Sequence, residues 1–169
     1  MRIAYLSTFH PYRGGIAQFN ARLMRELEHQ GQQVSPFTFS RQYPDLLFPG
    51  KTQLVTADDH QADAVNAPRV LDSISPFSWL SAAKRIGREQ PDLLLMKYWM
   101  TFFGPSLGTV AGRLKAKGTK VISILDNVVP HEGRFFDKPF TRYFLERNHG
   151  FIAMSAAVQR DLLALRPDA

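Results

Sequence analysis

Short apolar runs alternate with amphipathic segments along most of the chain. Continuous apolar runs such as DLLLMKYW and KVISIL are typical of strands that are buried on both faces of a parallel sheet. Segments whose apolar residues recur three or four positions apart, such as the one after Gly15, predict amphipathic helices. The predicted strands cover residues 2–8, 33–40, 92–99, 120–125 and 150–154. The predicted helices cover residues 16–30, 76–90, 105–117, 139–148 and 155–165.

This alternation predicts an α/β fold with a Rossmann-like, doubly wound, mostly parallel sheet and helices on both faces. Residues 41–75 interrupt the pattern because they are polar, contain prolines and show little periodicity, and we interpret them as an excursion or a lid-like loop. The 169 residues suffice for one domain with a sizeable core, since a chain of this length buries roughly 70% of its unfolded surface. We therefore predict a single domain over residues 1–169.

Polar side chains occur where two of the predicted strands end. Doubly wound sheets bind ligands beyond the carboxyl ends of their strands, where the following loops meet. The loop after the first predicted strand contains Gly14 and Gly15, so we expect the polar residues to lie near these glycines. The candidates are Tyr98, Asp126, Asn127, His131 and Glu132.

Gly14 and Gly15 precede a predicted helix, so their amides and the positive end of the helix dipole could hold a phosphate. The alternative is an ordinary tight turn, because the stretch matches neither the G-x-G-x-x-G fingerprint nor a Walker A loop. A nicotinamide cofactor would also require an acid at the end of the second strand, where this sequence has Ser40 and Arg41. NAD is therefore disfavoured, and an NADP site is left barely open. Arg41 is instead a candidate contact for an anionic or sugar ligand, although charged loop residues are more often simply solvated.

His131 and the adjacent Glu132 form a candidate catalytic pair. An imidazole titrates near neutral pH and a carboxylate can fix its tautomer, so the pair could act as a base or orient a substrate. The alternative is a structural hydrogen bond from a loop histidine, since adjacent loop residues need not face each other. Asp126 and Asn127 have a structural alternative as well, because both residue types cap turns.

The composition limits which kinds of site and partner the chain can have. The chain has no cysteine, which excludes disulfides and thiolate sites, and its five histidines do not fall at metal-ligand spacing, so no metal is expected. The formal net charge of +6 and the sequence pI of about 9.8 favour an anionic partner, such as a phosphorylated small molecule or an anionic lipid. Nucleic acid is not expected as a partner, because no known DNA- or RNA-binding motif is present.

No apolar run approaches the length of about 20 residues that a membrane-spanning helix needs, and the cytoplasm is the expected location. Several aromatic residues, with Lys84, Arg85 and Arg88 close by in sequence, could nevertheless form a surface that contacts anionic lipid. The alternative is that several of them belong to the core. These aromatic residues are Trp79, Trp99, Phe102 and Phe103.

Several segments, in their order and spacing, resemble the N-terminal half of GT-B glycosyltransferases of the family 4 type. These segments are RIAYLSTFHPYRGGIAQFNARLMRELEHQG, QPDLLLMKYW, KVISILDNVVPHE and FIAMSAAVQRDLLAL. The stretches SRQYPDLLFPGKTQ and DSISPFSWL resemble a bacterial subgroup, in which a histidine-asparagine pair followed by P-H-E ends the strand. This chain has Asp126 at the position of that histidine, so the role of the imidazole is not carried over, whereas His131 matches its own position.

The resemblance implies a retaining transferase that moves a sugar from a nucleotide-sugar donor to an acceptor hydroxyl of a glycan or a lipid-linked substrate. It identifies the chain as the acceptor-side half of a GT-B fold and implies, as partner, a C-terminal donor-binding domain that these residues lack. Gly14 and Gly15 are then expected near the donor diphosphate, and the catalytic candidates are His131 and Asp126. The expected contacts to acceptor or sugar are Asn127, Glu132, Tyr98 and Arg41.

The resemblance further implies no cofactor or metal, with the nucleotide sugar as co-substrate, and a role in polysaccharide biosynthesis. The expected location is the cytoplasm, at the inner face of the membrane if the acceptor is lipid-linked. Two other hypotheses stay open: one half of a GT-B-like sugar-nucleotide epimerase, and a non-catalytic module that binds a nucleotide or a glycan. A membrane-recruitment role is a third hypothesis, as an added property of a basic, aromatic-rich chain.

Overall fold

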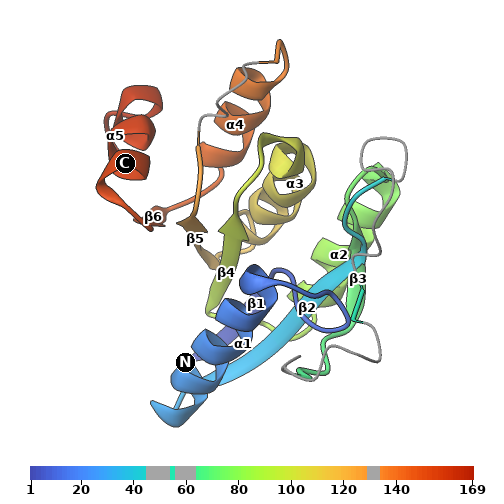
Figure 1. Ribbon diagram of the computed structural model, residues 1–169. Coiled ribbons are helices and arrows are strands. Elements are labelled where there is room, and N and C mark those ends of the chain that lie inside the picture. Colours follow the sequence, from blue (N-terminus) through green and yellow to red (C-terminus); the bar gives the residue numbers. More distant parts are fainter. Residues whose placement is uncertain (45–53, 56–63, 129–133) are drawn as a thin grey trace.

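Six strands form one sheet in the computed structural model, which describes residues 1–44, 54–55, 64–128 and 134–169 (Figure 1). The strands are β1 (Arg2–Leu6), β2 (Gln33–Arg41), β3 (Arg69–Asp72), β4 (Leu93–Tyr98), β5 (Lys120–Leu125) and β6 (Gly150–Ala153). The sheet order is β3-β2-β1-β4-β5-β6, and every neighbouring pair is parallel. The predicted Rossmann-like fold is therefore confirmed. The strand order reverses between β1 and β4, which is the topological switch point where such sheets bind ligands.

Helices cover both faces of this sheet. They are α1 (Gly15–His29), α2 (Pro76–Gly87), the short 3-10 helix η1 (Thr101–Phe103), α3 (Gly104–Lys115), α4 (Asp137–Leu145) and α5 (Ala156–Leu165). Side chains of α1 pack with Ile3, Tyr5 and Leu95 on one face. Those of α2, α3, α4 and α5 join the core on the other face. In the described part of the chain, no helix is long and apolar enough to cross a bilayer.

The sequence of β4 shows why it forms a central strand. Alternate residues of a strand point to opposite faces, and Leu94, Met96 and Tyr98 enter the core that α3 and α4 cover, whereas Leu93 and Leu95 face α1. Both faces of this strand are therefore buried, which explains its continuous apolar sequence.

Strand β3 lies inside the segment that we predicted as an excursion, and that part of the prediction is wrong. Four residues, RVLD, pair in parallel with β2. The strand is held by contacts distant in sequence, since the Arg69 guanidinium donates hydrogen bonds to the carbonyls of Phe39 (3.2 Å) and Ser40 (2.6 Å). Such tertiary contacts leave no periodic signal in a strand this short.

Three glycines spaced four residues apart on α3 let α4 pack closely against it. A Cβ atom added to Gly104 would lie 2.4 Å from the carbonyl oxygen of Phe140. A Cβ atom on Gly108 would lie 2.7 Å from Cδ1 of Tyr143, and one on Gly112 would lie 3.2 Å from Cδ of Arg147. This contact fixes α4, the helix that the chain enters after β5 and the polar residues at its end.

Candidate functional site

The carboxyl edge of the sheet carries a buried lysine beside the switch point. Lys97 lies near the end of β4, two positions after Leu95, so its side chain turns to the face that α1 covers. The residue is only 2% exposed, and lysine is almost never fully buried unless it is paired. Its charge therefore needs a partner inside the protein.

Asp126 supplies this partner. It directly follows β5, in which Ile124 pairs with Lys97, so the two charged side chains are diagonal neighbours across the strands. Lys97 Nζ donates a hydrogen bond to Asp126 Oδ1 at 2.6 Å. The ammonium also lies 3.9 Å from the centre of the Phe19 ring of α1, which is a cation–π contact. Because the Asp126 side chain is 28% exposed, the pair reaches from the interior to the surface.

Asn20 of α1 organises a second buried polar group at the same edge. Its Oδ1 accepts a hydrogen bond of 2.6 Å from the Tyr5 hydroxyl, and its Nδ2 donates to Ser7 Oγ and to the carbonyl of Thr8, both at 2.8 Å. Burial raises the pKa of Tyr5, and the charge of Asp126 raises it further, so the phenol stays protonated and donates. This network fixes α1 against the residues that follow β1.

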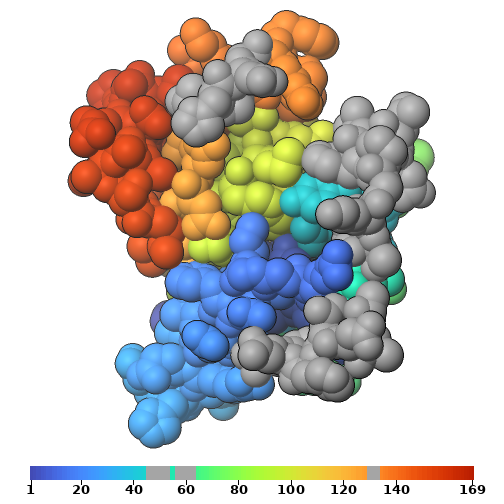
Figure 2. Space-filling view, in the orientation of Figure 1, coloured from blue at the N-terminus to red at the C-terminus, as the bar shows by residue number. Residues whose placement is uncertain are grey.

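The glycine loop ends where α1 begins. Gly14 has a φ of 106°, a left-handed conformation that favours glycine. Among the described residues, no atom lies within 4 Å of a Cβ added to Gly14 or Gly15, so the backbone there is open to an incoming group. Phe19, one turn further along α1, contacts Lys97, which links this helix end to the ion pair. In Figure 2, blue atoms of the α1 region meet yellow-green and orange atoms of the segment around β4 and β5 on one face.

The structure thus brings Gly14, Gly15 and Asp126 to one edge of the sheet. Asn127 follows Asp126 directly and is half-buried. His131 and Glu132 lie outside the described residues, so their predicted roles stay predictions.

Tyr98 is not placed to contact a ligand, in contrast to our expectation. Its side chain is fully buried on the face opposite to Lys97, where its ring stacks on Phe144 with ring centres 4.3 Å apart. Its hydroxyl lies 3.1 Å from Thr141 Oγ1, and burial raises its pKa above the ordinary value. The phenol therefore belongs to the contact between β4 and α4.

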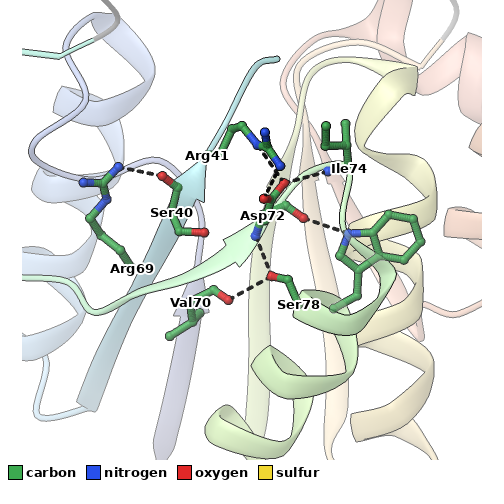
Figure 3. Close-up of polar contacts among 8 residues, drawn as sticks. Ser40, Arg41, Arg69, Val70, Asp72, Ile74 and Ser78 are labelled. Atoms are coloured by element: carbon green, nitrogen blue, oxygen red, sulfur yellow. Dashed lines mark hydrogen bonds and ion pairs between the residues drawn. The ribbon is translucent and has the colours of Figure 1, made fainter. Parts of the chain in front are cut away.

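Arg41 ends β2 as expected, but its guanidinium is engaged within the protein (Figure 3). It forms a two-pronged ion pair with Asp72 at the end of β3, with nitrogen–oxygen distances of 3.1 and 2.5 Å. Burial raises the pKa of Asp72, but the hydrogen bonds and charge of Arg41 and backbone donors such as the Ile74 N–H outweigh this effect and lower it. The Arg41 side chain remains about half exposed. Its ion pair with Asp72 joins the carboxyl ends of β2 and β3.

The aromatic residues that we considered for lipid contact are largely used inside the protein. Phe103 is fully buried, and Trp79 donates its indole hydrogen bond to the carbonyl of Asp72 at 2.8 Å. The phenylalanines that the structure exposes are others, Phe77 at 86% and Phe135 at 94%. Phe103 is therefore unavailable for lipid contact, whereas Trp79, Trp99 and Phe102 are only partly buried, and the lipid-contact hypothesis stays a prediction.

A hollow of about 370 Å³ lies at the other end of the strands, lined in part by Arg2, Asp92 and Lys117. The Arg2 guanidinium lies 3.6 Å from the Asp92 carboxylate, so these two charges already pair with each other. Because ligands of doubly wound sheets bind at the carboxyl ends of the strands, we place the functional site at the opposite edge. Among the described residues, no group of three or more His, Cys, Asp and Glu side chains could hold a metal ion.

The sequence analysis missed Lys97 and Asn20. The signal for Lys97 was a single cation inside the apolar run LLLMKY, where a lysine must find a partner or reach water. The signal for Asn20 was its polar amide among the apolar residues on the buried side of the amphipathic helix α1. Both signals become specific only when the fold shows which residues face them.

Comparisons with known proteins agree with this architecture. A family model described as "Glycosyl transferase 4-like domain" matches residues 14–169. An alpha-glucosyltransferase solved in complex with UDP-glucose and DNA containing an abasic site superposes with a TM-score of 0.61 at 12% identity, over 100% of this chain and 40% of that chain. An alpha-glucosyltransferase solved with UDP and a 13-mer DNA containing a central A:G mismatch gives a TM-score of 0.58 at 12% identity, over 95% and 39%. This chain therefore spans about 40% of the length of these structures. No curated protein sequence matches it.

Proposed function

This chain belongs to the glycosyl transferase 4-like domain family, and from that premise we propose that it is the acceptor-side half of a retaining glycosyltransferase. The enzyme would move a sugar from a nucleotide-sugar donor to an acceptor hydroxyl of a glycan or a lipid-linked substrate. The observation that carries the proposal is the family match over residues 14–169, together with an open glycine loop and the partly exposed carboxylate of Asp126 at the switch-point edge.

Each of these features has a chemical use in sugar transfer. The backbone amides of the first turn of α1, which have no partner within the helix, suit the developing negative charge on the leaving diphosphate. The Asp126 carboxylate accepts hydrogen bonds, which is how proteins orient sugar hydroxyls. His131 remains the proposed partner for the donor sugar or the acceptor.

The proposal includes a second domain that binds the donor. Only about 40% of the length of the glucosyltransferase structures corresponds to this chain, so the 169 residues alone offer one side of a cleft. We therefore expect the isolated chain to transfer sugar very poorly, and the chain joined to its donor-binding domain to be active.

The test uses the protein with its donor-binding domain and a panel of nucleotide sugars that begins with UDP-glucose. Release of the nucleotide diphosphate is followed with and without candidate acceptors, which are simple glycosides and lipid-linked sugars. Acceptor-dependent release supports a transferase, and a product with the anomeric configuration of the donor supports retention. Conversion of the donor to its epimer without release would support the epimerase hypothesis, and saturable binding without turnover by the 169-residue chain would support a binding module.

A further inference from the structure

Lys97 is the most deeply buried charged side chain at the carboxyl edge, and the proposed function so far gives it no role. We propose that Lys97 is a positioning residue, which holds the Asp126 carboxylate by one oxygen so that the other oxygen can accept a hydrogen bond from a sugar hydroxyl. This inference rests on the proposed function, because it assigns Asp126 to the binding of sugar.

The first argument is geometric. Asp126 is anchored through its backbone, since its N–H donates to the carbonyl of Tyr98 at 2.9 Å, and through its side chain, since Lys97 holds Oδ1 at 2.6 Å. The backbone anchor fixes the position of the residue, and the hydrogen bond from Lys97 favours one orientation of its carboxylate. In the described part of the chain, Oδ2 is then the oxygen that remains for a ligand.

The second argument concerns the environment of the ammonium. Lys97 is 2% exposed and its Nζ lies 3.9 Å from the centre of the Phe19 ring. Burial and the contact with the Phe19 ring disfavour movement of the ammonium into water, so the lysine supplies a steady partner for the carboxylate. Phe19 lies on the first turns of α1, so the same contact sets the distance between Asp126 and the glycine loop.

The third argument is that a simple packing role does not need these charges. A pair of oppositely charged groups at a buried position adds little net stability, and apolar residues of similar size often serve as well or better. Leu95 occupies the same face of β4 two positions earlier and packs there without any charge. A charge at position 97 is therefore needed only if a carboxylate is needed at position 126.

The experiment compares Lys97→Met, Asp126→Asn and the double variant in the protein with its donor-binding domain, and Lys84→Met is the control on the exposed side of α2. Thermal unfolding and steady-state kinetics with the donor and acceptor found active in the panel are measured for each. We expect Asp126→Asn to lower Tm by about 5–10 °C, because it leaves Lys97 buried and unpaired, and Lys97→Met to lower it less, because Asp126 reaches water.

The double variant separates a structural from a functional role. We expect it to regain most of the lost Tm, because no unpaired charge remains, while kcat/KM stays at least about tenfold below that of the unchanged protein. Recovery of activity together with Tm would show that the pair is only structural and would overturn the inference. Single variants with unchanged Tm would overturn it as well, because the pair would then not be formed. If the unchanged protein turns over no nucleotide sugar, the proposed function itself fails and the inference fails with it.

Discussion

The glycines of α3 offer the sharpest test of how the helices on the far side of the sheet are packed. Gly108 lies in the middle of α3 and faces Tyr143 of α4, whereas Gly112 lies one turn further, in the last turn of α3, and faces Arg147 just beyond α4. Replacing either by alanine should stabilise α3 itself by about 1 kcal/mol, because glycine is a poor helix residue. The two variants therefore differ only in what the new methyl group meets.

At Gly108 the methyl group would lie 2.7 Å from Cδ1 and 2.8 Å from Cε1 of Tyr143. The ring cannot move aside easily, because its hydroxyl lies 3.0 Å from Thr109 Oγ1 and the guanidinium of Arg147 lies 3.5 Å from its centre. Overpacking of this kind costs about 1–3 kcal/mol. We take the upper part of that range, subtract the helix term, and expect Gly108→Ala to destabilise the protein by about 1–2 kcal/mol.

At Gly112 the methyl group would lie 3.2 Å from Cδ of Arg147, which is part of a flexible side chain. We expect Gly112→Ala to be neutral or to stabilise by up to about 1 kcal/mol. For a chain of this size 1 kcal/mol corresponds to roughly 2–4 °C in Tm, so thermal unfolding followed by circular dichroism resolves the difference. A Gly108→Ala variant as stable as the unchanged protein, or two variants with the same loss, would refute this account of the contact.

Two further predictions concern the glycine loop and the end of α4. Gly14→Ala should lower stability by about 1–3 kcal/mol in thermal unfolding, because a φ of 106° with a ψ of 174° is a backbone conformation that is essentially restricted to glycine. Gly15→Ala, with open space for its methyl group, should leave Tm nearly unchanged, and equal effects of the two changes would contradict this reasoning. Partial desolvation, and after it the charges of three nearby basic side chains, lower the pKa of His149 in the folded protein. Below about pH 6.5 the histidine of the unfolded chain therefore binds a proton more readily than that of the folded protein, and the stability of the folded protein falls. The difference in Tm between the unchanged protein and the His149→Asn variant should therefore decrease as the pH is lowered from about 7.5 to about 5.5. A difference in Tm that does not depend on pH would argue against this effect of His149.

The fold was largely readable from the sequence because its central strands are buried on both faces. A strand such as β5 is mostly apolar because both of its faces are buried, and a helix such as α1 is apolar on one side, so burial leaves a recognisable pattern in each. The serine before α5 also predicted its start, and Ser155 Oγ accepts a hydrogen bond from the Val158 N–H at 3.2 Å. The prediction missed β3 because only Leu71 of its four residues is fully buried, and the hydrogen bonds of Arg69 and Asp72 that also hold this strand leave no periodic signal in the sequence.

The sequence predicted only part of the candidate site, because the central strands that made the fold predictable are buried on both faces. The rule that ligands bind beyond the carboxyl ends of strands selected Asp126 and the glycine loop, and both lie at the switch-point edge. It could not tell which of two neighbouring residues faces that site. In a strand that is buried on both faces, the apolar residues do not mark which face is which, so Tyr98 was chosen and Lys97 was passed over.

The position of Lys97 links the stability of this fold to its proposed function. On the face of the sheet that α1 covers, the interior is apolar along β4 and β5, and charge first appears at the last positions before the strands end. A carboxylate that stood there alone would be free to turn toward water, and an ammonium alone would be costly to bury. Together, under the proposed role, the two groups hold the Asp126 carboxylate as a hydrogen-bond acceptor at the carboxyl edge of the sheet. The pair adds little net stability, so it serves the proposed binding of a sugar more than the packing of the core. Because Phe19 of α1 completes the pair, a change in the glycine loop should alter the placement of Asp126 as well as its own backbone.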